Sequence, residues 1–452
     1  MGKNNHFSGN PTHRRSFIAT MFTGALSGLF LRKGIAGITL LQESVFPKFS
    51  SPEGPNNPMG TELGIVPGRV AWAHDPKAVL WNETSGNWWD EAANDQERIV
   101  TMVSKSVQSI TNEPTDKKAW KALFADFNKN RGKGNKGYSK GEKVAIKINL
   151  NNDRTSYDDT PWINTSPQVI FAVVKGLVKE SGVAEENITI FDAIRYVTPH
   201  MYDYIHKAFP GLKFVDGYGG LPGRIKSEWT SAKITYAVEN KCGPGIATCA
   251  TEADYLINIY TAKGHPATGV TLSAKNHYGS IDGRDHYYIK GAKMGYNQYN
   301  PLVEVMGHRD LGAKTLLYVC DMLYSCYHSD ALPIKWKMAP FNNSWPASIF
   351  VSQDPIACDS VATDFLTAEF DARTDIPVGV NAKGKKVDMS NCDTFLHEAA
   401  LAHNPPSKVV YAPNGDGVKM QSLGVHEHWN NVAEKKYSRN LGKNKGIELI
   451  TI

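Results

Sequence analysis

Short β-rich runs alternate with a helical pattern through the middle of the chain, and this alternation is the strongest constraint on its fold. Residues 143–150 (KVAIKINL) form a β-rich run, and residues 166–181 follow with a capping Ser, a Pro and amphipathic helical spacing. Two further apolar runs follow at 188–191 and 212–215. A strand, a helix and a strand at this spacing need a crossover connection, which makes the strands parallel. The sequence therefore predicts an α/β fold, a mostly parallel sheet with helices on both faces, in a single large domain with insertions.

Polar residues follow most of the predicted strands, and three later runs, 255–260, 315–319 and 348–351, continue the pattern. Because the carboxyl ends of parallel strands lie on one edge of a sheet, we expect these polar residues to gather there. They are Asn149, Asp192, Asp216, Lys263, Asp321 and Asp354. The alternative for any single Asp is a helix cap or a turn, so it is their combination with lysines and histidines that indicates a site.

The segment 260–283 (YTAKGHPATGVTLSAKNHYGSIDG) carries a dense group of titratable side chains directly after an apolar run. Its lysines and histidines would repel one another if all were charged, so some must be neutral, paired with carboxylates or coordinating something. We predict that lysines bind an anionic group and that histidines move protons here, with catalytic roles for Lys263, His265, Lys275 and His277. The predicted substrate-binding residues are Lys147, Asn149, Asp192 and Asn276. The alternative is a solvated basic loop.

Two histidines stand two residues apart near the carboxyl terminus, in His426-Glu427-His428. On an extended segment they point to the same face, a spacing that metal sites use, with Glu427 turned away unless the backbone bends; the alternative is a surface turn. A divalent metal ion is therefore a candidate cofactor. The predicted metal residues are Asp321, Asp354, Asp359, His426 and His428.

The six cysteines include no C-x-x-C pair, so no iron–sulfur cysteine motif of ordinary spacing is present. Cys242 and Cys249 flank a Gly-Pro-Gly turn that can bring them within disulfide distance, and we expect them to be paired in an oxidising compartment.

The first 37 residues have the pattern of an export signal. A polar, basic lead ends in Arg14-Arg15-Ser16-Phe17-Ile18, and a short, weakly apolar run follows. The arginine pair resembles a twin-arginine signal, which predicts a periplasmic or extracellular protein with the twin-arginine export machinery as a partner. An uncleaved N-terminal anchor is the alternative. Residues 38–65, rich in Pro, Gly and Ser, are predicted to be a linker, and residues 66–452 the α/β domain.

The net charge of +5 is concentrated in this signal segment. Five positive residues lie there without an Asp or Glu: Lys3, Arg14, Arg15, Arg32 and Lys33. Subtracting them (+5 − 5) leaves the rest of the chain near neutrality, which argues against nucleic acid and against a charged membrane surface as partners.

Several motifs together resemble the bacterial and archaeal domain-of-unknown-function family 362, over about residues 143–370. They are Lys147-Ile-Asn149, Thr165-Ser-Pro167, Ala253-Asp-Tyr-Leu-Ile-Asn258, Lys263-Gly-His265, Gly269-Val-Thr-Leu-Ser-Ala-Lys275-Asn276 and Ser352-Gln-Asp354-Pro355-Ile-Ala-Cys-Asp359. The resemblance implies an α/β fold and redox or metal chemistry, because many relatives carry iron–sulfur cysteine motifs; this sequence lacks them. In a fainter likeness, His265 and Lys275 with Gly269 between them are arranged similarly to the cofactor-bearing loop of nickel-pincer lactate racemases.

Taken together, these features predict an exported, metal- or cofactor-dependent enzyme that carries out redox or isomerase-type chemistry on a small anionic or sugar-like substrate. The alternative is a periplasmic ligand- or glycan-binding module without catalysis, in which some of the 10 Trp and 19 Tyr residues would supply stacking surfaces.

Overall fold

The computed structural model describes residues 54–151, 161–238, 245–282, 295–371, 373–376 and 387–452. The predicted export signal and Cys242 of the predicted disulfide lie outside these residues. The strands are β1 (Met59–Gly60), β2 (Arg69–His74), β3 (Val144–Lys147), β4 (Ile188–Asp192), β5 (Lys213–Asp216), β6 (Arg224–Lys226), β7 (Tyr255–His265), β8 (Gly269–Thr271), β9 (Thr315–Cys326), β10 (Ser348–Ser352), β11 (Val425–His426) and β12 (Glu448–Thr451). The helices are α1 (Gln96–Thr111), α2 (Asp116–Asn130), α3 (Pro167–Lys175), α4 (Pro199–Ala208), α5 (Thr248–Thr251), α6 (Ser273–Asn276), α8 (Pro301–Gly307), α9 (Pro355–Phe370) and α10 (Asp393–Ala400).

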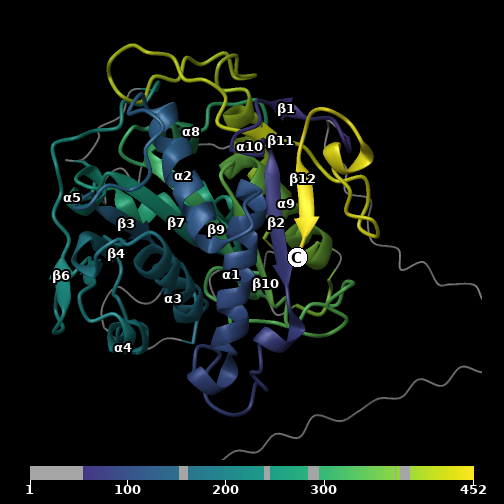
Figure 1. Ribbon diagram of the computed structural model, residues 1–452. Coiled ribbons are helices and arrows are strands. Elements are labelled where there is room, and N and C mark those ends of the chain that lie inside the picture. Colours follow the sequence, from purple (N-terminus) through teal and green to yellow (C-terminus); the bar gives the residue numbers. More distant parts are fainter. Residues whose placement is uncertain (1–53, 152–160, 239–244, 283–294, 372, 377–386) are drawn as a thin grey trace, which may run out of the picture. The chain divides into compact units, whose positions relative to one another are not determined.

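Within the described residues, one ten-stranded sheet has the order β12-β2-β10-β9-β7-β3-β4-β5-β6, with β8 paired to β7 (Figure 1). The strands from β9 to β6 in this order are parallel to one another, as the alternation of strands and helices predicts. β10 is antiparallel to both of its neighbours, β9 and β2. The predicted α/β fold with a mostly parallel sheet is therefore confirmed.

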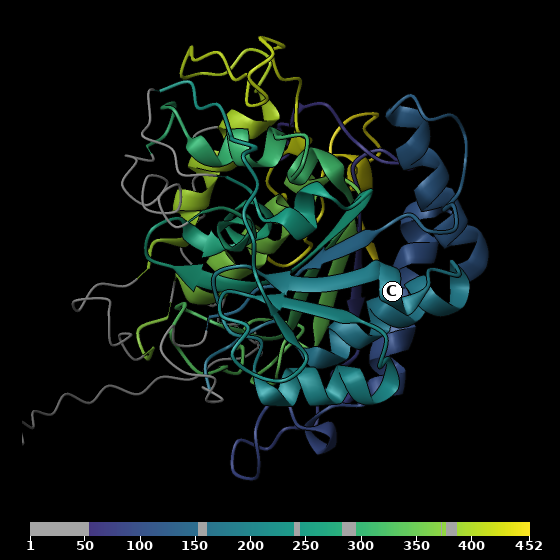
Figure 2. The same ribbon diagram turned by 90° about the vertical axis from the view of Figure 1, so that its left-hand side faces the viewer.

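Helices cover both faces of this sheet, as Figure 2 shows in a view turned by 90°. α1 to α4 pack on one face, where Val103 and Val173 join a buried apolar cluster with Ile146 of β3. α5, α6, α8, α9 and α10 pack on the other, where Val361 of α9 joins a second cluster with Tyr260 of β7. Burial on both sides explains why the central strands read as continuous apolar runs.

Aspartates cap two of the long helices. The Asp95 side chain accepts a hydrogen bond from the backbone N–H of Arg98 at the start of α1, at 3.1 Å. Asp354 does the same for Ala357 at the start of α9, at 2.9 Å, with Pro355 in the first turn. These side chains satisfy backbone donors that lack a partner inside the helix.

The antiparallel direction of β10 reverses one prediction. A strand that runs the other way ends at the opposite edge, so Asp354, which follows β10, does not lie at the carboxyl edge of the parallel strands. Its carboxylate accepts from the backbone N–H groups of Leu63 and Val425 as well as Ala357. The expectation that Asp354 shares an edge with Asp321 is wrong, because periodicity predicts a strand but not its direction.

The end of the predicted linker is part of the folded structure, since β1 pairs with β11 in the register Met59 to His426. None of the helices in the described part of the chain combines the length and apolar character needed to cross a bilayer.

Candidate functional site at the carboxyl edge of the sheet

Four predicted site residues lie at or near the carboxyl ends of neighbouring parallel strands: Lys147 on β3, Asp192 on β4, Lys263 on β7 and Asp321 on β9. All four side chains are buried. Charged groups so far removed from water must be paired, hydrogen-bonded, neutral or in contact with a ligand.

Lys147 is completely buried and is neutralised from the next strand. Its Nζ donates to Asp192 Oδ2 at 3.0 Å and to Asn276 Oδ1 at 3.1 Å. Burial lowers the pKa of Lys147, and the Asp192 carboxylate opposes this by raising it. Lys147 is thus bonded directly to two other predicted substrate-binding residues, so the structure brings the three together.

Asn276 connects this ion pair to its surroundings through both atoms of its amide. Its Oδ1 also accepts from Asn149 Nδ2, at 3.3 Å, and its Nδ2 donates to Asn258 Oδ1 at 2.7 Å. The other carboxamide oxygen, Asn149 Oδ1, is buried and has no hydrogen-bond partner among the described groups. Among the described residues, one acceptor at this edge is therefore available to a further donor.

His277, a predicted proton carrier, is completely buried beside the same amides. Asn258 Nδ2 donates to its Nε2 at 3.3 Å, so the imidazole proton is on Nδ1, 3.1 Å from Ser280 Oγ. Burial lowers the pKa of His277 to about 3, so the ring is neutral at physiological pH. This geometry favours a role in orienting Asn258.

Lys263 on β7 differs from Lys147 in its partners. Its Nζ donates to the carbonyl oxygen of Ile163 at 2.7 Å, and no carboxylate among the described residues forms an ion pair with it. Burial lowers the pKa of Lys263 to about 8, because nearby acidic groups such as Asp330 offset the loss of solvation only in part. A lysine with such a pKa is partly unprotonated near neutral pH and can accept a proton.

Asp321 holds the start of α3 against β9. Its Oδ2 accepts from the backbone N–H of Ser166 at 2.7 Å, and its Oδ1 accepts from that of Leu323 at 3.1 Å. Burial raises the pKa of Asp321 to about 6, against the lowering effect of these bonds and of the Lys263 ammonium. The side chain therefore acts here as a helix cap.

The remaining predicted catalytic residues are held by local contacts. The Lys275 Nζ lies 3.4 Å from the centroid of the Tyr278 ring. The half-buried His265 ends β7, and its Nδ1 accepts from the backbone N–H of Ala267 at 3.1 Å.

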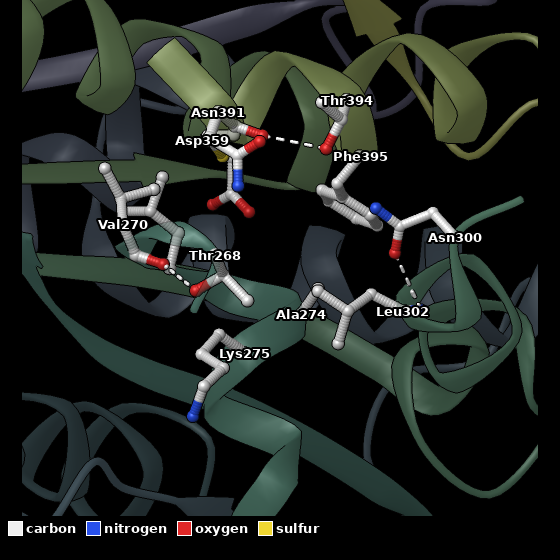
Figure 3. A pocket seen from close by; sticks show the side chains of 12 residues that line it. Thr268, Val270, Ala274, Lys275, Asn300, Leu302, Asp359, Asn391, Thr394 and Phe395 are labelled. Atoms are coloured by element: carbon white, nitrogen blue, oxygen red, sulfur yellow. Dashed lines mark hydrogen bonds between the residues drawn. The ribbon is translucent and has the colours of Figure 1, made fainter. Parts of the chain in front are cut away.

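Lys275 and Asp359 both line a narrow pocket between α6, α8, α9 and α10, and Figure 3 shows the Lys275 amine directed away from Asp359. Asp359 Oδ2 accepts from Ser273 Oγ at 2.5 Å and from the Ser273 backbone N–H at 3.1 Å. Burial raises the pKa of Asp359 to about 7. Asp359 thus fixes the start of α6, the helix that carries Asn276.

Of the predicted metal residues, the structure brings together His426 and His428 with Asp393 of α10, which the sequence analysis missed. Among the described residues, Asp321, Asp354 and Asp359 do not join this group. Glu427 is turned away, as predicted, and its carboxylate accepts from Ser438 Oγ at 2.6 Å. No local signal marks Asp393, because helix packing brings it to the histidines from more than thirty residues away in the chain.

Asn258 was also missed as a site residue, although a signal was present. It is a buried polar residue in the middle of the apolar run of β7, and such a residue needs a specific partner. Gly279 is a second omission. A Cβ there would lie 2.4 Å from Asp192 Oδ1, so any larger residue would push the Asp192 carboxylate out of its place in the ion pair.

Residues 144–364 match the family model whose description is Domain of unknown function (DUF362). The resemblance predicted from the motifs is confirmed over this range, which contains Lys147, Asp192, Lys263, Asn276 and Asp321. Asp393, His426 and His428 lie beyond it. The sequence matches none of the curated proteins with which it was compared. The likeness to lactate racemases stays a prediction.

The carboxyl edge therefore combines a neutralised buried ion pair, a chain of amides and one buried amine without a carboxylate partner among the described residues. An ammonium donor and an unused amide acceptor on neighbouring strands suit a small molecule that has both an anionic oxygen and a hydroxyl group.

Proposed function

We propose that this protein is an enzyme that binds a small anionic hydroxy compound at the carboxyl edge of its sheet, with Lys263 as the group that contacts the anion and exchanges a proton with the bound molecule. The observation that carries the proposal is the environment of Lys263. A completely buried amine whose single described partner is a carbonyl oxygen destabilises the fold unless a ligand uses it.

The surrounding residues support this role. Lys147 is already neutralised by Asp192, so the anion of a ligand is attracted chiefly to Lys263. Asn149 Oδ1 offers an acceptor for a hydroxyl hydrogen. Because the pKa of Lys263 is about 8, the amine can both hold and release a proton near neutral pH, as isomerase-type chemistry requires.

A ligand screen with two matched variants tests the proposal. Small hydroxy- and oxo-carboxylates, sugar acids and inorganic phosphate are added to wild type, Lys263→Met and the control Lys213→Met, which changes an exposed lysine of β5. We expect at least one carboxylate to raise the melting temperature of wild type and of the control, and not that of Lys263→Met.

The same compounds are then incubated in deuterated water and followed by proton NMR. We expect wild type and Lys213→Met to exchange carbon-bound hydrogen of the bound compound, and Lys263→Met to lose the exchange. If binding depends on Lys263 but no hydrogen exchange follows, the protein is a ligand-binding module and not an enzyme. Equal binding by wild type and Lys263→Met, or no binding at all, would overturn the site.

A further inference from the structure

Two imidazoles and a carboxylate converge between β11, α9 and α10, outside the carboxyl edge. One ligand atom from each of Asp393, His426 and His428 lies within 4.8 Å of the others, and all three residues are buried. The rings of His426 and His428 are 4.9 Å apart between centroids and nearly perpendicular, at 84°. His428 Nε2 lies 3.7 Å from Asp393 Oδ2.

The hydrogen bonds around His426 determine which of its nitrogens carries the proton. Its Nδ1 lies 2.9 Å from Ser360 Oγ. The single hydroxyl hydrogen of Ser360 is donated to the carbonyl oxygen of Ile356 at 2.7 Å, so Ser360 can only accept from His426. The proton of a neutral His426 is therefore on Nδ1, and its Nε2 carries a lone pair. That Nε2 is buried and has no hydrogen-bond partner among the described groups.

His428 is held in the same manner by a carboxylate. Its Nδ1 lies 2.6 Å from Asp364 Oδ1, and the other oxygen of Asp364 accepts from the Trp429 backbone N–H at 3.0 Å and from the Tyr437 hydroxyl at 2.8 Å. Because Asp364 accepts a hydrogen bond from His428 Nδ1–H, the lone pair of His428 is on Nε2, the nitrogen that faces Asp393. A carboxylate–histidine pair of this kind orients ligands in metal sites and raises their basicity.

We propose that Asp393, His426 and His428 bind a first-row divalent transition-metal ion of the zinc type, with Asp364 and Ser360 as the groups that orient the two imidazoles. The ligand atoms of the two imidazoles and the carboxylate lie close enough together to share one cation, and such an ion would satisfy the buried Nε2 of His426. Imidazole nitrogen with one carboxylate suits zinc or iron, whereas calcium and magnesium prefer oxygen alone. The inference does not rest on the function proposed for Lys263.

Three protein ligands leave a coordination position for water or another molecule, which is the pattern of a reactive centre rather than of a closed structural one. α10 also carries His397, four residues after Asp393 and hence on the same helix face, with its ring stacked on Tyr296. The ion would therefore lie in a buried, nitrogen-rich setting.

Metal analysis of the full chain tests the proposal. The protein is stripped with a chelator and titrated with Zn²⁺ in competition with a chromogenic chelator, and the bound metal is measured by mass spectrometry. We expect one zinc ion per chain, no competition from Ca²⁺, and a rise in melting temperature with Zn²⁺ because the ion binds only the folded state.

Four variants assign the site. His426→Ala and the nearly isosteric Asp393→Asn remove ligands, Asp364→Asn weakens an orienting group, and His403→Ala changes an exposed histidine as the control. We expect zinc affinity to fall by about 10–100-fold for Asp364→Asn and by more for the two ligand variants, with the control unchanged. Circular dichroism of the metal-free proteins checks that each variant is folded.

Two results would overturn the site: wild type that holds no zinc after loading, or folded Asp393→Asn and His426→Ala proteins that bind zinc as tightly as wild type. The second result would assign any bound zinc to other residues.

Discussion

At the carboxyl edge of the sheet the buried Lys147 and Asp192 balance each other, whereas Asp393, His426 and His428 bring three ligand atoms together at a second buried place. Lys147 has Asp192 at 3.0 Å and two further oxygens. His426 Nε2, by contrast, is buried without a described partner. The Lys147–Asp192 pair has its partners among the described side chains, as a structural polar cluster does, whereas the buried His426 nitrogen keeps a lone pair that a bound ion can use.

The same contrast appears on a smaller scale between the two buried lysines of neighbouring strands. Lys147 is part of a satisfied network, and Lys263 has one described carbonyl partner. Replacing each lysine should therefore have opposite consequences for stability, although both side chains are completely buried.

The largest effect is expected for Lys147→Met. Removing the ammonium leaves the Asp192 carboxylate buried and uncompensated, which should lower the free energy of unfolding by about 3–5 kcal/mol. Urea unfolding followed by circular dichroism measures the change.

The matched control for Lys147→Met is Lys143→Met, just before the same strand. Its ion pair with Glu252, at 3.1 Å, has side chains that are 53% and 58% exposed, so the change should stay within about 0.5 kcal/mol. If Lys147→Met unfolds at the same urea concentration as this control, the ion pair contributes nothing to the fold.

The second effect concerns Lys263 and depends on pH. The folded-state pKa of Lys263 is lowered to about 8, from the 10.5 that is usual for a lysine, so between these values the unfolded chain binds more protons than the folded one. Stability attributable to this residue therefore rises with pH across that window, by roughly 3 kcal/mol at most.

Unfolding of wild type and Lys263→Met should be compared from pH 7.5 to pH 10.5. We expect Lys263→Met to be the more stable protein at pH 7.5, because the buried ammonium is destabilising there, and the advantage to shrink as the pH rises. Groups common to both proteins cancel in the difference. If the difference in stability between the two proteins stays constant across this range, Lys263 does not lose its proton at a lower pH in the folded protein than in the unfolded chain.

Much of this edge could be predicted from the sequence, because strand–helix alternation implies parallel strands and parallel strands place their ends together. That argument located Asp192, Lys263 and Asp321, which are far apart in the chain. It failed for Asp354, because nothing in the run 348–351 distinguishes an antiparallel strand from a parallel one.

The histidine group was only half predictable. The spacing of His426 and His428 on an extended segment indicated a shared face, and the ring contact agrees with it. Asp393, Ser360 and Asp364 come from two helices whose relative packing depends on the whole apolar core, so local spacing could not identify them. Short-range geometry can be predicted from a sequence, whereas the meeting of distant helices requires the fold.

The smallest effect tests how closely the ion pair at the carboxyl edge is packed, through Gly279→Ala. The new Cβ would lie 2.4 Å from Asp192 Oδ1, and the Gly279 backbone is held by a 2.7 Å hydrogen bond from the Ala193 N–H to its carbonyl oxygen. The carboxylate must therefore move away from Lys147, at a cost of about 1–2 kcal/mol, since a side-chain end can shift more easily than backbone. Gly137→Ala is the control, because its nearest neighbour would be an ordinary 3.5 Å from the new atom. Repeating Gly279→Ala in a Lys147→Met background sharpens the comparison. If the methyl group acts by pushing Asp192 away from Lys147, the double variant should lose less stability than the sum of the two single losses. A loss equal to that sum would show that Gly279 is needed for some other contact.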